Sequence, residues 1–326
     1  MREFSKRFGV SCRGASLRLQ RVVTDFGADV SFSRVNDKLC EHYGFEISVS
    51  RIREVVLSHG QRILDQQTLR DDWPLDKGVE QVIAQTDGSM VPVVETDPEA
   101  ADRRKGKVLK WQEIRLCLAH RSDSLQIHYG GNFSGGVEQT GQWLYDCVRR
   151  AGFGRSTSVH VVGDGAGWIH RQVEQRFGAN GTFLVDFMHL SEYLSEAGKS
   201  FCADAKRWLK CQQARLKDNQ AKQVLLELKP HLESSEVDED NAPVRKAYRY
   251  LHNRQDQVDY RGARAHKLPI GSGEIESGHR YVIQARLKLA GSWWSPDSID
   301  RMLALRLCRA NQEWHDYWDC VTRRAV

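Results

Sequence analysis

The amino-acid sequence predicts a mixed α/β fold in which helices flank a sheet, and three observations lead to this class. β-branched and alternating residues indicate extended chain between residues 82 and 129. Two short apolar segments, at 158–162 and 182–187, are typical of strands that are buried on both faces of a sheet. Helical periodicity separates these two segments and dominates the chain after residue 189.

Residues 31–60 predict two short helices that are joined by a turn at Gly44. Ser33 can cap the first helix, and either Ser48 or Ser50 can cap the second. A hydroxyl suits these positions because it accepts a hydrogen bond from a free amide at the helix start.

Apolar residues at 17–23 can supply a third helix, so this region has the pattern of a helix-turn-helix unit. The last helix of the unit would then present Arg51 and Arg53 to a groove or the phosphates of DNA. A helical hairpin in an ordinary protein core has the same pattern. Both interpretations stay open on these residues alone.

The extended chain and the helices after it follow a definite order. Three strands come first, then a helix, a strand, a helix and a strand: 82–95, 107–120, 125–129, 141–150, 158–162, 169–177 and 182–187. Three strands in a meander followed by this alternation are the RNase H-like plan of a mixed sheet covered by helices.

The chain is expected to divide into four parts. They are a helix-turn-helix DNA-binding region, the first part of the sheet core, an all-helical insertion, and C-terminal helices that complete the core: 1–75, 76–190, 191–268 and 269–326.

Positive and negative side chains nearly balance, so the positions of the basic residues are more informative than the net charge. The chain has 48 Lys and Arg against 43 Asp and Glu, a net charge of only +5. Arg103, Arg104 and Lys105 form one basic run, and residues 245–267 contain a second. Such a run is typical of a nucleic-acid contact, and it is also typical of a solvated face.

Cysteine usage and hydropathy exclude two classes of protein. The eight cysteines occur singly, without the spacing of a disulfide framework or a zinc ribbon. No apolar stretch of about 18 residues is present, so the chain is expected to be soluble and cytoplasmic, without a membrane partner.

Carboxylates stand at two unusual places in the predicted sheet. Asp87 interrupts the apolar first strand, and Asp164 follows the strand at 158–162 between two glycines. Each can be part of a simple turn. Two carboxylates near the sheet centre can also hold Mg²⁺ for phosphodiester chemistry, with Glu274 or Glu276 of a later helix as the third ligand. These glutamates lie about 200° apart around a helix, so only one can face the sheet.

Four stretches of sequence resemble a known family. QTDGS, VVGDGAGWI, DFMHLSEYL and PIGSGEIESGHRYVIQARLKLAGSWW look like the motifs of the ISKra group of bacterial insertion-sequence transposases, relatives of the Mutator-like DDE enzymes. The resemblance covers about residues 31–314. It implies that Asp87, Asp164 and Glu276 are the catalytic residues, which hold two Mg²⁺ or Mn²⁺ ions, with Glu274 as the second choice for the third ligand.

The same resemblance implies auxiliary residues around the metal ligands. Asp186 and His189 match an Asp-x-x-His signature, in which His189 contacts the scissile phosphate or orients a ligand, unless it is only hydrogen-bonded inside the fold. Phosphate contacts near the cut are implied for four residues, namely His279, Arg280, Arg286 and Lys288. Trp293 and Trp294 can stack on an unpaired base or belong to the core.

A transposase of this kind cleaves and joins double-stranded DNA, both the terminal inverted repeats of its element and the target. Pairing of two DNA ends implies a homo-oligomer, with a dimer expected. Two alternatives remain on sequence alone, an RNase H-like structure-selective nuclease without strand joining and a non-catalytic helix-turn-helix regulator.

Overall fold

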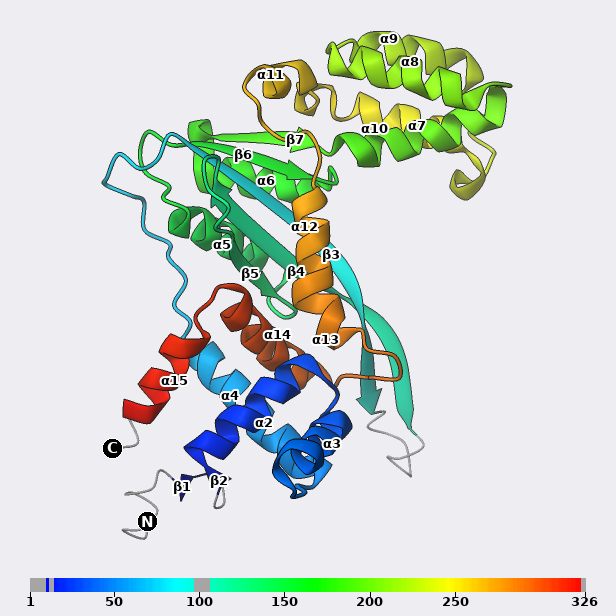
Figure 1. The fold of residues 1–326 in the computed structure, drawn as a ribbon. Coiled ribbons are helices and arrows are strands. Elements are labelled where there is room, and N and C mark those ends of the chain that lie inside the picture. The colour runs from blue at the N-terminus through cyan, green and yellow to red at the C-terminus, as the bar shows by residue number, and fades with distance from the viewer. Residues whose placement is uncertain (1–9, 12–14, 97–105, 324–326) are drawn as a thin grey trace.

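The computed structural model describes residues 10–11, 15–96 and 106–323, and at its centre lies a five-stranded mixed sheet (Figure 1). The strand order is β5-β4-β3-β6-β7. Neighbours are antiparallel from β5 to β3 and parallel from β3 to β7. The strands are β3 (Gln81–Thr96), β4 (Lys107–Arg121), β5 (His128–Asn132), β6 (Ser158–Gly163) and β7 (Gly181–Val185).

The predicted mixed sheet flanked by helices is confirmed, and one strand lies elsewhere than expected. The third strand is β5, three residues later than the predicted segment at 125–129. β4 runs on to Arg121, so the following residues are needed to turn the chain, and Leu125 is left 99% exposed. An apolar residue alone was therefore a misleading signal there.

Helices cover both faces of the sheet (Figure 1). α5 (Gly136–Arg150) and α6 (Gly167–Phe177) lie on one face, and α12 (Gly273–Gly278) crosses the other. α12 continues through a π-helical turn, His279–Gln284, into α13 (Ala285–Leu287). Successive side chains of β3 point to opposite faces of the sheet and so contact the helices on both sides. Thr86 contacts the Cys117 thiol on the α5 side, whereas Gln85 accepts a hydrogen bond from the Ile275 amide of α12.

β3 and β4 form an arm that extends beyond the other strands (Figure 1). They pair from Val82 and Arg121 out to Thr96 and Lys107, whereas β6 ends opposite the first third of β3. The arm is held at its side by backbone hydrogen bonds between β3 and Trp294. It therefore carries the sheet towards the N-terminal helices.

Within the described residues, three helices precede the sheet, after a two-residue strand pair, β1 (Val10–Ser11) and β2 (Ala15–Ser16). They are α2 (Leu17–Asp29), α3 (Phe32–Tyr43) and α4 (Val49–Gln66). Gly44 ends α3 with φ +71°, which fits the expected turn. The expected cap at Ser33 is wrong, because α3 starts one residue before it and Ser31 is the N-cap.

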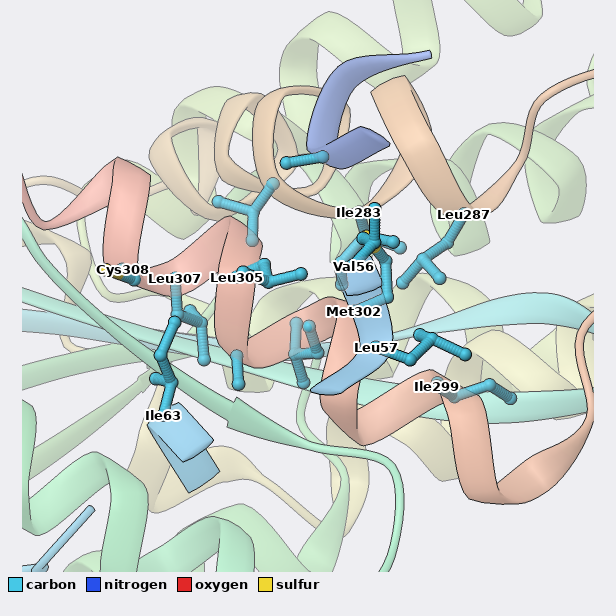
Figure 2. Packing of buried hydrophobic residues seen from close by; sticks show 14 of the residues in the cluster. Val56, Leu57, Ile63, Ile283, Leu287, Ile299, Met302, Leu305, Leu307 and Cys308 are labelled. Carbon is cyan, nitrogen blue, oxygen red and sulfur yellow. The ribbon is translucent and has the colours of Figure 1, made fainter. Parts of the chain in front are cut away.

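The N-terminal helices share one hydrophobic core with the end of the chain. Val56 and Leu57 of α4 pack with Ile299 and Met302 of α14 (Pro296–Ala310) and with Ile283 (Figure 2). α15 (Trp314–Arg323) completes this core. The first and last of the four expected parts are thus packed together, so neither forms a separate body.

Helices α7 to α11 lie beyond β7 (Figure 1) and have a second core, which includes Leu184 and Val185 of β7. Their bounds are α7 (Phe187–Phe201), α8 (Ala205–Lys217), α9 (Ala221–Leu228), α10 (Pro243–His252) and α11 (Tyr260–Ala265). Within the described ranges, no helix combines the length and the apolar character that crossing a membrane requires.

Candidate active site

Asp87 and Asp164 lie side by side near the centre of the sheet. The parallel register pairs Gln85 of β3 with Val162 of β6, so two residues further on each strand the two aspartates are neighbours. Asp164 directly follows the end of β6, and its carboxylate accepts the Ala166 amide at 2.9 Å. The structure thus brings together the two residues that interrupt the strand pattern in the sequence.

Burial makes the Asp87 carboxylate hard to ionise. Loss of solvent, with the charges of Asp164 and Glu113 added, raises the pKa of Asp87 to about 6, although the Gly88 amide and His189 act in the opposite direction. About 36% of the Asp87 side chain remains exposed. The carboxylate is therefore both destabilised as an anion and accessible, the combination expected of a cation ligand.

Asp87→Asn is expected to stabilise the metal-free protein at pH 8. The pKa of Asp87 in the folded chain lies above its ordinary value of 3.8, so the folded chain binds more protons between about pH 4 and 6. The free energy of unfolding must fall as the pH rises through this window. Removing the charge should recover about 1 kcal/mol at pH 8, after discounting for exposure, in urea unfolding with chelator present.

Asp123→Asn is the matched control for this measurement. Asp123 is ion-paired with Arg121, and that hydrogen bond lowers the pKa of Asp123, so its removal should not stabilise the protein. A free energy of unfolding lower for Asp87→Asn than for the wild type at pH 8 would contradict the prediction. It would show that contacts of the Asp87 carboxylate outweigh the cost of its burial.

The two glutamates of α12 have different surroundings. The Glu274 carboxylate accepts a hydrogen bond from Gln85 Nε2 at 3.1 Å and lies 3.1 Å from His120 Nε2, an interaction that raises the pKa of His120. Glu276 is exposed, and its carboxylate makes no hydrogen bond or ion pair with any described residue. The Glu274 carboxylate is therefore held by residues of the sheet, whereas the Glu276 carboxylate is available to bind a cation.

Helix geometry places Glu276 on the flank of α12 nearer to Asp87. Glu276 lies about 60° around the helix from His279, whose ring approaches Asp87, and about 200° from Glu274, which is held above β4. Among the described residues, no three carboxylate, imidazole or thiol groups lie close enough together to hold one ion. The structure thus shows a carboxylate pair with a third carboxylate on the neighbouring helix.

His279 was expected to contact a phosphate, and in the structure it is buried. The ring is 4% exposed and its Nε2 lies 3.6 Å from the Asp87 carboxylate. Burial lowers the pKa of His279 to about 4, so the imidazole is neutral at physiological pH. The His279 ring therefore packs beside Asp87, and because it is buried and neutral it carries no charge that could attract a DNA phosphate.

Asp186 and His189 begin α7 and take different positions. Asp186 is buried and accepts the amides of Met188 and His189 at the helix start, and its other oxygen accepts the Ser272 amide at 2.6 Å. The His189 ring remains partly exposed and its charge lowers the pKa of Asp87. His189 thus belongs to the site face, whereas Asp186 ties α7 to the loop before α12.

Asp186→Ala is expected to lower the free energy of unfolding by about 2–3 kcal/mol, because it removes both a helix cap and the contact to Ser272. Asp204→Ala is the control, since Asp204 caps α8 through Arg207 alone and is exposed. The control should cost about 1 kcal/mol in urea unfolding. Equal losses for the two variants would mean that the Ser272 contact adds nothing.

Two residues of α10 and its end hold the loop that carries Asp164, and the sequence analysis missed them. Tyr250 Oη donates to the Asp164 carbonyl at 2.6 Å, and Arg254 Nε donates to the Gly165 carbonyl at 2.7 Å. Gly165 has φ +80°, and a Cβ there would lie 2.6 Å from Tyr250 Oη. The loop is therefore positioned from the helical insertion, over a sequence separation that no local pattern reveals.

Two of the expected DNA contacts on the last motif are in the core. Arg286 is 1% exposed and donates to the Gly27 carbonyl at 2.8 Å. Trp294 is buried and donates to the Leu287 carbonyl. Packing against the N-terminal helices covers these two residues, so neither lies on the outer surface of the described structure. Arg286 and Trp294 both line a pocket below that surface.

The remaining expected contacts differ in exposure. Arg280 and Trp293 are exposed, and Lys288 is half-buried. On α4, Arg51 pairs with Glu54 at 2.8 Å, whereas Arg53 is exposed. Arg103, Arg104 and Lys105 lie outside the described residues.

Sequence comparison relates the second half of the chain to a protein family. Residues 149–316, more than half of the chain, match the Uncharacterised protein family (UPF0236). The matched range contains Asp164 and α12, while Asp87 lies before it. No similar sequence was found among curated proteins. The chain therefore belongs to the family UPF0236.

Proposed function

We propose that this protein is a DDE-type transposase with an RNase H-like core, which cleaves and joins DNA at the ends of an insertion sequence. The observation that carries the proposal is the proximity of Asp87 on β3 to Asp164 just after the adjacent strand β6, beside a helix that bears Glu276. The strand order and directions, with three antiparallel strands followed by two parallel ones, support the RNase H-like assignment.

We propose that Asp87, Asp164 and Glu276 hold a pair of Mg²⁺ or Mn²⁺ ions, with the two aspartates side by side and Glu276 supplied by α12. Burial and a neighbouring carboxylate both raise the pKa of Asp87, and a divalent cation would offset both effects. Hard cations of this kind prefer carboxylate oxygens. When bound, they lower the pKa of an attacking oxygen and stabilise the leaving oxygen.

The residues of the chain then orient two in-line displacements. In the first, a water oxygen forms a bond to phosphorus and the 3′ oxygen leaves as a free hydroxyl. In the second, that hydroxyl attacks a phosphate of target DNA, whose own 3′ oxygen leaves. Tyr250 and Arg254 hold the Asp164 loop in place, and His189 stands beside Asp87 at the open face.

The proposal includes the partners of the reaction. Double-stranded DNA of the terminal repeats and of the target is the substrate, and two copies of the chain would pair two ends. Helices α3 and α4, joined at Gly44, are proposed as the helix-turn-helix unit, with Arg53 exposed near the start of α4.

Strand joining is the experiment that tests the function. Purified protein is incubated with Mg²⁺, pre-cut terminal-repeat DNA and a target plasmid, and joined products are separated on a gel. A joined product that disappears with Asp164→Asn is expected. Cleavage without any joined product would indicate a structure-selective nuclease, and DNA binding without either product would indicate a regulator.

A further inference from the structure

A pocket of about 410 Å³ lies where the N-terminal helices, the β3 arm and the loop before α14 meet. Its lining includes two arginines, four serines and three large aromatic residues, and it includes no carboxylate. Guanidinium groups and hydroxyls together are the donors that proteins use for phosphate oxygens. The pocket is therefore suited to an anion that also carries an aromatic group.

Arg286 gives this pocket an unusual electrostatic character. Its guanidinium lies over the adjacent rings of Phe32 and Trp294, 4.8 and 4.7 Å from their centroids. Nη2 is buried without a hydrogen-bond partner, and no described carboxylate forms an ion pair with the group. Burial lowers the pKa of Arg286 to about 10. Such a buried charge is costly, and an anion in the pocket would offset the cost.

A second cation and a helix start border the same pocket. Arg53 is exposed, and among the described residues its guanidinium donates to the hydroxyls of Ser298, at 3.2 Å, and Ser295, at 3.4 Å, and to no others. Ser295 is the N-cap of α14, which has 15 residues, and its side chain makes no capping hydrogen bond. The partial positive charge of the helix start therefore adds to that of the arginines.

Trp293 stands at the rim of the pocket and is 42% exposed. Its ring lies 6.5 Å from that of Trp111 on β4, which is also exposed and does not itself line the pocket. An exposed indole can stack on any base. The pocket also borders Val94, seven residues along β3 from Asp87, which corresponds to roughly 23 Å of strand.

We propose that this pocket binds one phosphate of a DNA strand through Arg53 and Arg286, while Trp293 stacks on an adjoining base. The inference rests on the proposed function, since the strand is the one whose cleaved phosphate lies at Asp87 and Asp164. At about 3.4 Å per nucleotide the pocket contacts DNA about seven nucleotides from the cut. It would anchor the strand without taking part in the chemistry.

Equilibrium binding of a labelled 15-nucleotide single strand tests the pocket, with the full chain carrying Asp164→Asn so that no cleavage occurs. Arg53→Gln and Trp293→Ala should each weaken binding on the order of tenfold. Arg53→Gln should also lower the slope of log affinity against log salt by roughly one. Trp293→Phe should retain most of the affinity, because it keeps an aromatic face.

Arg34→Gln is the matched control, because Arg34 is an exposed arginine of α3 that does not line the pocket. The control should change affinity by less than about twofold. Equal effects of Arg53→Gln and Arg34→Gln would overturn the proposal. A second result would also overturn it. If inorganic phosphate stabilises the wild type but not Arg53→Gln, while both proteins bind the single strand equally well, the pocket binds free phosphate rather than DNA.

Failure of this inference and failure of the proposed function are distinguishable. If the wild type joins DNA ends and the pocket variants bind the single strand normally, only the pocket assignment falls. If the wild type neither cuts nor joins DNA but Arg53→Gln and Trp293→Ala lose binding relative to Arg34→Gln, the pocket stands and the transposase proposal falls.

Discussion

Asp87→Asn and Asp164→Asn are each expected to reduce DNA cleavage and joining by about a thousandfold or more. Asn keeps the shape of the side chain and removes the charge, so the cation that both aspartates would share loses a ligand. Loss of a metal-ligand carboxylate withdraws several kcal/mol of transition-state stabilisation, and about 4 kcal/mol corresponds to this factor. Initial rates of joined product, measured with excess protein, provide the comparison.

Stability and a control variant separate chemistry from folding. Both variants should remain folded, because Asp87 is destabilised by burial and by the neighbouring Asp164 charge. Asp123→Asn, at an exposed ion pair with Arg121, should keep full activity. Activity that survives Asp164→Asn within about tenfold would remove Asp164 from the metal site and with it the proposed mechanism.

Glu276→Gln is expected to abolish activity to a similar extent, whereas Glu274→Gln should reduce it by less than about threefold. Glu276 lies on the Asp87 flank of α12, and no described residue pairs with it. Glu274 is engaged by Gln85 and His120, and a glutamine can still accept the hydrogen bond from Gln85. The two substituted positions lie two residues apart on α12, and the variants are matched controls for each other.

A second measurement shows whether Glu274 has the role that the structure gives it. The Glu274 carboxylate raises the pKa of His120, so Glu274→Gln should lower that pKa, as followed by NMR of the imidazole protons. A large loss of activity for Glu274→Gln, with Glu276→Gln nearly active, would move the third ligand to Glu274.

Local patterns were sufficient for the sheet and for the carboxylate pair. Alternating and β-branched residues mark each long strand, because side chains on a strand point to opposite faces. Asp87 and Asp164 could be expected near each other because one interrupts the first strand and the other follows the fourth, and the parallel pairing of β3 with β6 makes them neighbours. The position of β5 was less certain, because the length of the preceding turn depends on where β4 ends.

Contacts between distant parts of the chain account for what the sequence analysis missed. Arg286 and Trp294 have the residue types of a DNA-binding surface, yet α2 and α3 pack over this segment and bury both. His279 is buried in the same way against Asp87. A residue type specifies the chemistry that a side chain can perform, whereas its exposure depends on which helix packs over it.

The amino-acid sequence by itself determined the order of strands and helices and singled out the two aspartates that interrupt the strand pattern, because these depend on periodicity and spacing within short segments. It left Glu274 and Glu276 as alternatives, between which only the family resemblance chose. Only the tertiary structure decided that Tyr250 holds the Asp164 loop and that Arg53 meets Arg286 and Trp293 at one pocket. The physical reason is that packing of the two hydrophobic cores brings these residues together, over separations that leave no trace in local sequence.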